Sequence, residues 1–148
     1  MLSQQDMSDR LEIQDLLAKY CEAIDTRDFM ALDDVFTADA IIDYTEAGGS
    51  KGTVAETKEF LTEALAKFSN MQHMIGLPLI RIHGDTAHVR TALYNPMVLH
   101  NNGKPEIFFV GMWYCDRLTR TPEGWRISER SEEACYFHNL PESFQAVE

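Results

Sequence analysis

Cysteine, positive charge and long apolar runs are all scarce in this sequence. The three cysteines, Cys21, Cys115 and Cys135, include no CxxC pair, which predicts reduced thiols in a cytoplasmic protein rather than a disulfide framework. No apolar run approaches the roughly 18 residues of a membrane-spanning helix. The first residues also lack the basic and apolar regions of a secretory signal. The histidines are scattered without metal-ligand spacing, which argues against a zinc site.

Basic residues are outnumbered by acidic ones. Lys plus Arg total 13 against 24 for Asp plus Glu, so the formal charge is -11. Such a charge repels the phosphates of nucleic acids and the surface of an anionic membrane, and we expect neither as a partner. The segment 48–52 is rich in glycine but lacks the GxxxxGK[ST] spacing, which favours a flexible turn over a phosphate-binding loop.

What remains is the composition of an ordinary globular domain. The chain has 148 residues, of which 45% are hydrophobic and 25% are charged. A chain of this length buries enough apolar surface to fold without a disulfide or a metal. We expect a single domain over 1–148, with a core over about 5–137 and a tail over 138–148.

The first half of the chain has helical periodicity. One helix face is predicted from the spacing of Ile13, Leu16, Leu17, Tyr20 and Ile24. Asp9 followed by Glu12 is interpreted as the capping pair of this helix. Asp28 is predicted to cap a short second helix, and Thr53 with Glu56 is predicted to form the capping box of a third.

The second half has the alternation typical of strands. A short strand is expected over 40–44, before the third helix, and a mostly apolar strand over 71–82, where Pro78 indicates a bulge or an edge. Turn signals separate three further strands, expected over 86–99, 107–118 and 125–137. Helices followed by a strand meander predict an α+β fold, with a curved antiparallel sheet wrapped around three N-terminal helices.

The strand over 107–118 is apolar on both of its faces. Phe108, Val110, Met112 and Tyr114 alternate with Ile107, Phe109 and Trp113. Three helices cover only one face of the sheet, so the other face is expected to be buried between subunits. We therefore predict a homo-oligomer formed through the outer face of the sheet.

Three polar residues occupy positions where apolar ones are expected. Tyr20 lies on the buried stripe of the first helix, Asp25 lies where that helix ends, and His73 interrupts an apolar strand. Each has an ordinary structural interpretation: a core tyrosine with its hydroxyl at the rim, a helix cap, and a histidine with satisfied hydrogen bonds. Together they fit general-base chemistry, because a carboxylate fixes the tautomer of an imidazole and raises its basicity.

The pattern L-x-x-Y-x-x-A-x-D over 17–25 resembles the SnoaL-like branch of the nuclear-transport-factor-two-like superfamily. The continuation 28–40 and the closing Gly124-Trp125-Arg126-Ile127 are similar to the same family, so the resemblance covers about 5–137. It implies a cone-shaped α+β barrel with one deep apolar pocket. It also implies that the homo-oligomer is a trimer or a dimer formed through the outer face of the sheet. The residue pattern is nearest to the lyases of that superfamily, which include bile acid 7α-dehydratase, scytalone dehydratase and hexachlorocyclohexane dehydrochlorinase.

The resemblance also implies roles for individual residues. Asp25 and His73 match the acid–base pair of such lyases, and Tyr20 matches a tyrosine of the bile acid enzyme. Arg130 is similar to an arginine that several members point into the cavity. In a regular strand Arg130 would face the opposite side from Trp125 and Ile127. It therefore either follows a bulge or lies on the other face of the sheet.

Asn95 departs from the family pattern, because the bile acid enzyme has an acidic residue in this strand. An amide forms hydrogen bonds but transfers no proton, which argues against bile acid dehydration itself. Asn95 is therefore predicted to bind substrate, together with the aromatic residues Tyr44, Phe109 and Trp113.

The predicted function is a dehydration or a related elimination on a small hydrophobic cyclic molecule. His73 would take the proton, Asp25 would stabilise the imidazolium, and Tyr20 and Arg130 would stabilise the developing negative charge. Such chemistry requires no metal and no organic cofactor. An isomerase, a polyketide-type cyclase or a non-catalytic module for ligand binding or assembly remain alternatives on the same fold.

Overall fold

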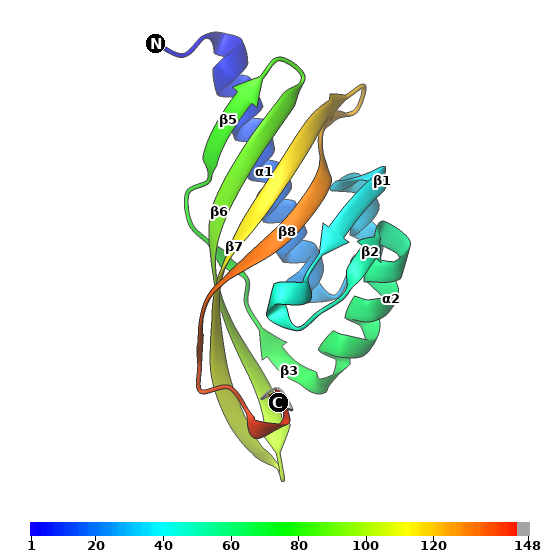
Figure 1. Cartoon of the computed structure of the whole chain (residues 1–148), viewed down its shortest axis with the longest axis vertical. Helices are drawn as coiled ribbons and strands as arrows, with labels where there is room; N and C mark the ends of the chain where they lie inside the picture. The colour runs from blue at the N-terminus through cyan, green and yellow to red at the C-terminus, as the bar shows by residue number, and fades with distance from the viewer. Residues whose placement is uncertain (145–148) are drawn as a thin grey trace.

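The structure, a computed structural model, describes residues 1–144. Its two longer helices, α1 and α2, both belong to the first half of the chain (Figure 1). The helical elements in order are α1 (Gln4–Thr26), η1 (Phe29–Asp34), η2 (Thr45–Ala47), α2 (Val54–Ala64), η3 (Leu65–Lys67) and η4 (Glu142–Phe144). The expected second helix is present as the 3₁₀ segment η1. None of the helices in residues 1–144 is long and apolar enough to cross a membrane.

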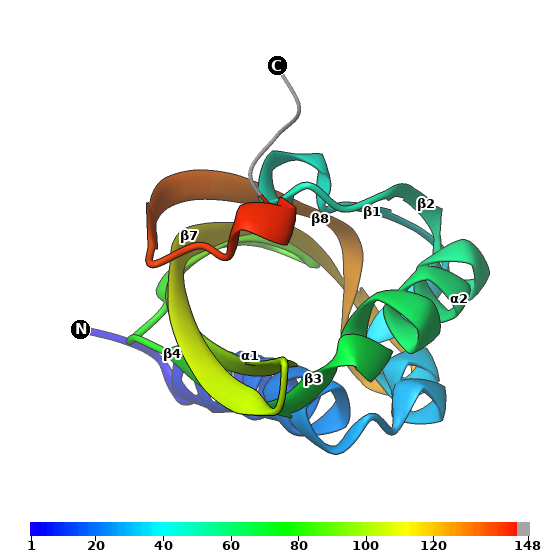
Figure 2. The ribbon, with the colours of Figure 1, turned by 90° about the horizontal axis from the view of Figure 1, so that it is seen from below.

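The strands form one strongly curved sheet. They are β1 (Phe36–Asp43), β2 (Lys51–Thr53), β3 (Phe68–Met71), β4 (Met74–Ile75), β5 (Leu79–His83), β6 (Thr86–Asn101), β7 (Lys104–Thr121) and β8 (Gly124–His138). Their order is β2-β1-β8-β7-β6-β3, and β4 and β5 also pair with β6. Seen from below, β6, β7 and β8 curl around the long axis, with α1 along one side (Figure 2). This is the expected α+β cone.

One pair of strands is parallel, although an antiparallel meander was expected. β1 pairs with β8 in parallel, with Ile42 opposite Arg130. A hairpin would force these strands to be antiparallel, but here a helix and several further strands separate them, so the connection leaves their direction free. The sheet is therefore mixed.

The two α-helices begin at capping boxes, one of them at an unexpected place. At α2 the backbone N–H of Glu56 donates to Thr53 Oγ1 at 3.3 Å, as predicted. At α1 the box is formed by Ser3 and Asp6, whose carboxylate accepts from the backbone N–H of Ser3 at 2.9 Å. The expectation that Asp9 opens this helix is wrong. Asp9 lies inside α1 and is buried.

The expected strand over 71–82 is divided into three pieces. β3 ends at Met71, β4 covers only Met74–Ile75, and the chain leaves the sheet again before β5 begins at Leu79. Pro78 cannot donate a ladder hydrogen bond, which accounts for the second interruption. The first interruption lies between β3 and β4, and it contains His73.

A bulge in β8 changes which residues face the helices. Leu118 pairs with Ile127, but Arg117 pairs with Glu129, so Ser128 is an additional residue in β8. Trp125 and Ile127 face inward before the bulge, and Arg130 faces inward after it. Arg130 therefore faces the interior because of a bulge. A bulge was one of the two possibilities that its position in the sequence left open.

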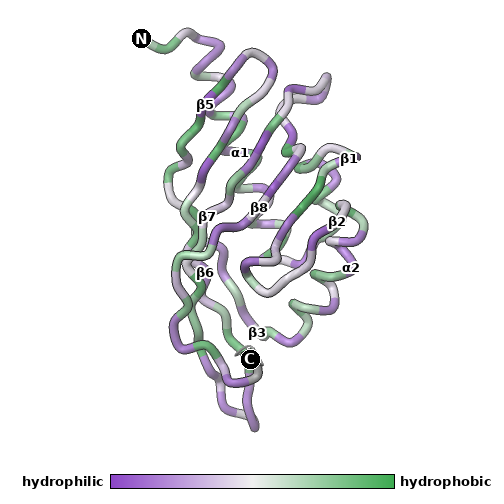
Figure 3. The backbone as a smooth tube through the Cα atoms, in the orientation of Figure 1, coloured by the Kyte–Doolittle hydropathy of each residue, from purple (hydrophilic) through white to green (hydrophobic). Residues whose placement is uncertain are grey.

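Polar contacts fix α1 against the inner face of the sheet. Asp9 accepts hydrogen bonds from Arg120 at 2.7 and 2.9 Å and from the indole N–H of Trp125 at 3.1 Å. One turn further along, Glu12 accepts from the backbone N–H of Trp125 at 2.9 Å. Hydrophobic and hydrophilic residues are interspersed along the long strands (Figure 3), and in the first part of β6 buried and more exposed residues alternate, as expected for one buried and one exposed face.

Candidate active site

The end of α1 and the interruption after β3 meet at one point inside the fold. α1 ends at Arg27, which has a left-handed φ of 59° and donates to the carbonyl of Phe68 at 2.6 Å. This contact ties the last turn of α1, which carries Asp25, to β3. His73 lies two residues beyond β3, where the chain is not held in the ladder.

Asp25 holds His73 through both its backbone and its side chain. The backbone N–H of His73 donates to the two carboxylate oxygens at 3.1 and 2.9 Å. The ring atom Nδ1 lies 2.6 Å from Asp25 Oδ1. The His73 side chain is 8% exposed and the Asp25 side chain 23%, so the pair is largely shielded from water. One carboxylate thus fixes the backbone of His73 through its N–H and the ring through Nδ1.

The other ring nitrogen of His73 is directed at Asn95. Asn95 lies on β6, is buried, and places its Nδ2 at 3.2 Å from His73 Nε2. Because an aspartate only accepts, the short contact assigns the proton to Nδ1, and Nε2 then carries the lone pair that accepts from the amide. The basic atom of this imidazole is therefore Nε2.

A cluster of three tyrosines surrounds the part of α1 that precedes Asp25. Only Tyr20 belongs to α1 itself. The hydroxyls of Tyr20 and Tyr44 lie 2.5 Å apart, and the ring of Tyr114 packs edge-on against Tyr20 at 5.5 Å. All three are buried, and burial raises the pKa of each phenol. They therefore stay neutral near pH 7 and act as hydrogen-bond donors or acceptors.

Arg130 completes this tyrosine cluster. Its guanidinium carbon lies 4.0 Å from the ring centres of both Tyr20 and Tyr114. It forms a bidentate ion pair with Asp116, with both contacts at 2.7 Å and both side chains fully buried. Burial lowers the pKa of Arg130, but the charge and the hydrogen bonds of Asp116, together with Tyr20 and Tyr44, outweigh this effect and hold the pKa well above its usual value. Arg130 is therefore a fixed positive charge.

The site residues fall into two groups that α1 connects. Asp25, His73 and Asn95 form one, and Tyr20, Tyr44 and Arg130 form the other. Cys21 lies one turn before Asp25 on α1, and burial raises its thiol pKa to about 11. The charge of Arg130 opposes this shift and that of Asp25 adds to it, so Cys21 lies within electrostatic reach of both groups.

Two of the predicted substrate-binding residues lie elsewhere. Phe109 and Trp113 alternate with the buried residues of β7 and lie on the outer face of the sheet. There Phe109 stacks on Tyr94, and Trp113 lies under the guanidinium of Arg90, 3.9 Å from it. The expectation that they line a pocket with His73 is corrected by this placement, because a side chain in a strand faces one side of the sheet only.

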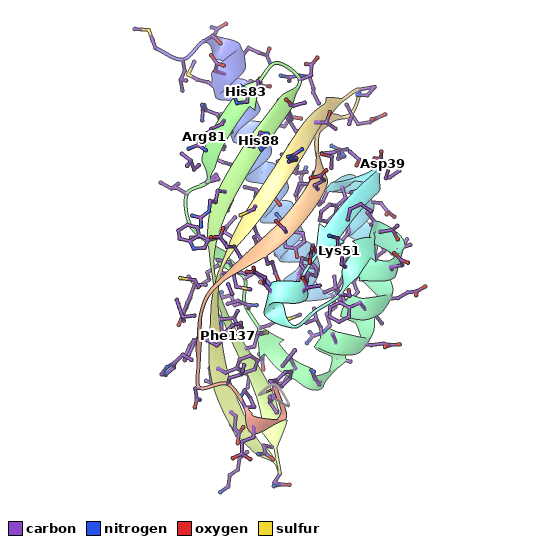
Figure 4. The ribbon with its side chains drawn as sticks, in the orientation of Figure 1. Asp39, Lys51, Arg81, His83, His88 and Phe137 are labelled. Atoms are coloured by element: carbon purple, nitrogen blue, oxygen red, sulfur yellow. The ribbon has the colours of Figure 1, made fainter. Side chains whose placement is uncertain are left out.

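Two hollows do not include His73 in their lining. One, of about 760 Å³, runs along α1, η1 and Trp125. The other, of about 610 Å³, is lined by both basic and acidic residues, which include Arg81 and His88 and also Arg130 and Asp116. Figure 4 shows Arg81, His83 and His88 together at the end of β5 and β6. The deep pocket beside His73 stays a prediction.

Sequence reasoning missed two acidic residues beside Arg130. Asp116 is its ion-pair partner, and Glu132 lies two residues further along the same face of β8. For Asp116 the sequence does contain a signal, because this residue falls on the side of β7 that is otherwise apolar. Glu132 could be assigned to the interior only with the bulge at Ser128 known. Within residues 1–144 no cluster of three or more acidic, histidine or cysteine side chains could hold a metal ion.

Comparisons with known proteins agree with this fold. An uncharacterized protein of Mycobacterium tuberculosis, Rv2910c, is 46% identical over 136 residues, which is 92% of each chain. A solved structure of a protein proposed to be an aromatic ring hydroxylase, from Novosphingobium aromaticivorans, is 30% identical, with a TM-score of 0.80 over 90% of this chain and 94% of that one.

More distant solved structures have the same fold. A protein of Novosphingobium aromaticivorans proposed to be a scytalone dehydratase is 14% identical, with a TM-score of 0.82 over 95% of this chain and 93% of that one. Hexachlorocyclohexane dehydrochlorinase from Novosphingobium barchaimii is 15% identical, with a TM-score of 0.78 over 92% of both chains. Proteins with this fold thus include enzymes. The family model of the SnoaL-like domain matches residues 5–131, and the chain belongs to this family.

Proposed function

We propose that this protein is a cofactor-independent lyase that removes water, or a similar leaving group, from a small, largely apolar cyclic substrate. The observation that carries the proposal is the 2.6 Å contact between His73 Nδ1 and Asp25 Oδ1. It leaves Nε2 as a base on a ring that Asp25 holds through Nδ1, while the same carboxylate holds the backbone of His73. Such a group contributes to catalysis only where a proton is removed, which distinguishes it from a binding residue.

In the proposed reaction His73 Nε2 takes a proton from a carbon atom of the substrate. The substrate displaces the Asn95 amide from Nε2, and at 3.2 Å this hydrogen bond is long enough to be given up. Asp25 remains on Nδ1 and stabilises the imidazolium that forms. Asn95 is then free to bind an oxygen of the substrate.

The tyrosines and Arg130 are suited to the oxygen atoms of the substrate. The electrons left on carbon move toward a carbonyl group, and a negative charge develops on its oxygen. The neutral hydroxyls of Tyr20 and Tyr44 can donate to this oxygen, and the guanidinium of Arg130 lies nearby. Nη1 of Arg130 is buried without a hydrogen-bond partner among the described residues, so it has an N–H to offer.

Similar proteins support an elimination. The names of two structural neighbours, dehydrochlorinase and dehydratase, describe loss of a small molecule from a substrate. These proteins are distant in sequence and share the fold alone, so their substrates do not transfer to this chain. The alternatives of an isomerase or a cyclase use the same proton abstraction and differ only in the later steps of the reaction.

The test uses 3-hydroxycyclohexanone, a cyclic β-hydroxy ketone that gives 2-cyclohexenone on loss of water. His73→Ala should slow this loss by about 10²–10⁴-fold, the usual contribution of a general base. His88→Ala is the matched control, because His88 is exposed on the outer face. Unchanged turnover in His73→Ala would refute the proposal.

The same compound in D₂O separates the alternatives. Exchange of its α-hydrogens without loss of water would favour an isomerase or a cyclase, because the proton is then taken and returned. Binding with neither exchange nor product would favour a non-catalytic module. Both outcomes would contradict the lyase assignment.

A further inference from the structure

Glu132 belongs to the same interior surface as Arg130, although the proposed reaction does not yet use it. It lies two residues after Arg130 on β8, beyond the bulge, and therefore faces the same side of the sheet. Across the ladder it is paired with Tyr114 of β7, which is paired in turn with Thr91 of β6. The row Thr91–Tyr114–Glu132 thus crosses three strands beside the tyrosine cluster.

Polar atoms in this region lack partners. Glu132 Oε2 is inaccessible to solvent and has no hydrogen-bond partner among the described residues. The same holds for Thr91 Oγ1 and Arg130 Nη1, and further along β6 for Asn95 Oδ1. Burying a polar atom without a hydrogen bond is unfavourable. Several such atoms on one interior surface indicate a place for an oxygen-bearing ligand or ordered water.

The surroundings of Glu132 favour its neutral form. Burial raises the pKa of this carboxyl to about 8, and the charge of Arg130 only partly opposes the effect. Arg130 is already neutralised by Asp116, which together with Asp43 disfavours a further negative charge. The titratable and charged groups around Glu132 are Arg130 on β8, Tyr114 and Asp116 on β7, Asp43 and Tyr44 at the end of β1, and Tyr20 on α1.

We propose that Glu132 is the general acid of this site: it carries a proton in the resting protein and donates that proton to the leaving oxygen of the substrate. This inference rests on the proposed function, in which His73 is the base. His73 takes a proton as the C–H bond breaks, and the freed electron pair forms the C=C bond. The C–O bond breaks, and the oxygen takes the proton of Glu132 and leaves as water.

The cycle closes without any further reagent. After the reaction His73 is an imidazolium and Glu132 is a carboxylate. One proton passes from His73 to Glu132 through solvent, and the resting state is restored. Neither tyrosine matches this task as well, since the pKa of each phenol lies above its usual value, whereas that of Glu132 lies near neutral pH.

The arrangement also limits the class of substrate. Arg130 and Asp116 cancel each other, and a protonated Glu132 leaves this end of the site without net charge. A carboxylate or phosphate substrate would gain no free cation there, whereas a neutral hydroxyl would receive a proton donor. We therefore expect uncharged hydroxy ketones rather than acids.

The decisive test compares two leaving groups on the same ring. Loss of hydroxide from 3-hydroxycyclohexanone needs a proton, whereas loss of acetate from 3-acetoxycyclohexanone does not. Glu132→Gln should slow the first reaction by about 10²–10⁴-fold and change the second by less than about threefold. Glu133→Gln is the control, because Glu133 lies on the outer face, where it pairs with Arg90 at 3.1 Å.

The outcomes separate this inference from the proposed function. His73→Ala should slow both reactions, because both need the base. If it does while Glu132→Gln slows both equally or neither, the acid role of Glu132 is wrong and the lyase assignment stands. If wild-type protein converts neither compound, or His73→Ala changes neither rate, the lyase assignment fails and the acid role fails with it.

A second measurement needs no substrate, and its decisive spectrum is that of the wild-type protein. Infrared difference spectra of the wild-type protein between pH 6 and pH 10 should show a protonated carboxylic acid that ionises near pH 8. The band should be absent from Glu132→Gln and Glu132→Ala and retained in Glu133→Gln. A wild-type spectrum without any carboxylic acid titrating above pH 6 would overturn the proposal.

Discussion

The geometry around Asp25 makes one carboxylate responsible for two tasks. It accepts from the backbone N–H of His73, which fixes the chain, and it contacts Nδ1, which fixes the ring. A substitution here therefore changes position and charge together. This explains why Asp25 and His73 should behave as one unit rather than as two independent contributors.

The first residue-scale prediction concerns the coupling of these two residues. Asp25→Asn should lose much of the general-base contribution of about 10²–10⁴-fold, because an amide can hold the ring but cannot stabilise an imidazolium. The double variant with His73→Ala should be no slower than His73→Ala alone. Initial rates with 3-hydroxycyclohexanone measure both effects. Multiplicative losses would show that the residues act separately.

A smaller effect is expected at Tyr20. Tyr20→Phe removes one hydroxyl but leaves the ring that packs against Arg130 and Tyr114. Its loss of rate with 3-hydroxycyclohexanone should be well below that of His73→Ala, because Tyr44 and Arg130 still offer donors. A loss as large as that of His73→Ala would instead assign the proton transfer to Tyr20.

Another residue-scale prediction concerns stability rather than rate. Arg120 holds the pKa of Asp9 well below its usual range, and the indole of Trp125 adds to the effect. A carboxyl whose folded-state pKa is depressed stabilises the fold above its unfolded-state pKa of about 3.9, and this stabilisation is lost as the pH falls toward the folded-state value. Asp9→Asn should lower the free energy of unfolding at pH 7 by about 2–4 kcal/mol.

Urea unfolding at pH 7 and at pH 3.5 checks this result. The wild-type protein should lose more stability between the two pH values than Asp9→Asn does. Asp6→Asn serves as a comparison, because Asp6 lies in the capping box of α1 and is not part of the buried pair. Equal acid sensitivity of wild type and Asp9→Asn would contradict the assignment.

At the scale of elements, the bulge at Ser128 decides which chemistry faces the interior. If the alternation of β8 ran through Ser128 without a bulge, Ser131 and Glu133 would face inward and Arg130 would face outward. Asp116 would then lie buried without its cation. The bulge thus places a charged pair in a strand that otherwise contributes apolar residues such as Ile127.

Arg130→Met should break this pair while the bulge stays in place. We expect a loss of about 3–5 kcal/mol in the free energy of unfolding, the usual effect of leaving one partner of a buried ion pair alone. Ser128→Ala is the control, because it keeps the bulge and loses only the hydrogen bond from Oγ to the carbonyl of Arg117. Thermal unfolding followed by circular dichroism measures both. An Arg130→Met variant as stable as Ser128→Ala would contradict this account.

Local patterns in the sequence predicted helices and strands well. Features that depend on contacts between distant parts of the chain could not be predicted from it. The capping box of Thr53 and Glu56 and the helical stripe of α1 are confirmed because both depend on residues a few positions apart. The parallel pairing of β1 with β8, and the contacts that bury Asp9, join distant parts of the chain and leave no local pattern. The proximity of Asp25 to His73 was inferred from the family resemblance rather than from spacing.

For the whole molecule, the unexplained surface is the outer face of the sheet. Ile107 and Tyr136 are each more than two-fifths exposed there, and Tyr94 stacks on Phe109 beside them. Gly111 lies beneath Tyr136, and a methyl group at this position would meet the tyrosine ring. Apolar residues gathered on one exposed face are typical of a contact between subunits, so the homo-oligomer remains our expectation.

Light scattering at micromolar concentration should report a mass above that of one 16.9 kDa chain. Ile107→Glu combined with Tyr136→Glu should shift this mass toward the monomer, because charges are costly to bury in an apolar contact. Met30→Glu is the control, since Met30 is exposed on η1, away from the sheet face. A wild-type protein that is monomeric under these conditions would contradict the prediction.

The contacts that hold α1 have a consequence for how the chain is made. Asp9 and Glu12 find their partners in Trp125, which lies 116 and 113 positions further along the chain. During synthesis at about 5–20 residues per second, roughly ten seconds pass between the appearance of the helix and that of the strand that covers it. Throughout this interval the apolar side of α1 lacks the strand against which it packs in the finished fold. The nascent chain is therefore open to chaperones and to aggregation until almost its last strand has left the ribosome.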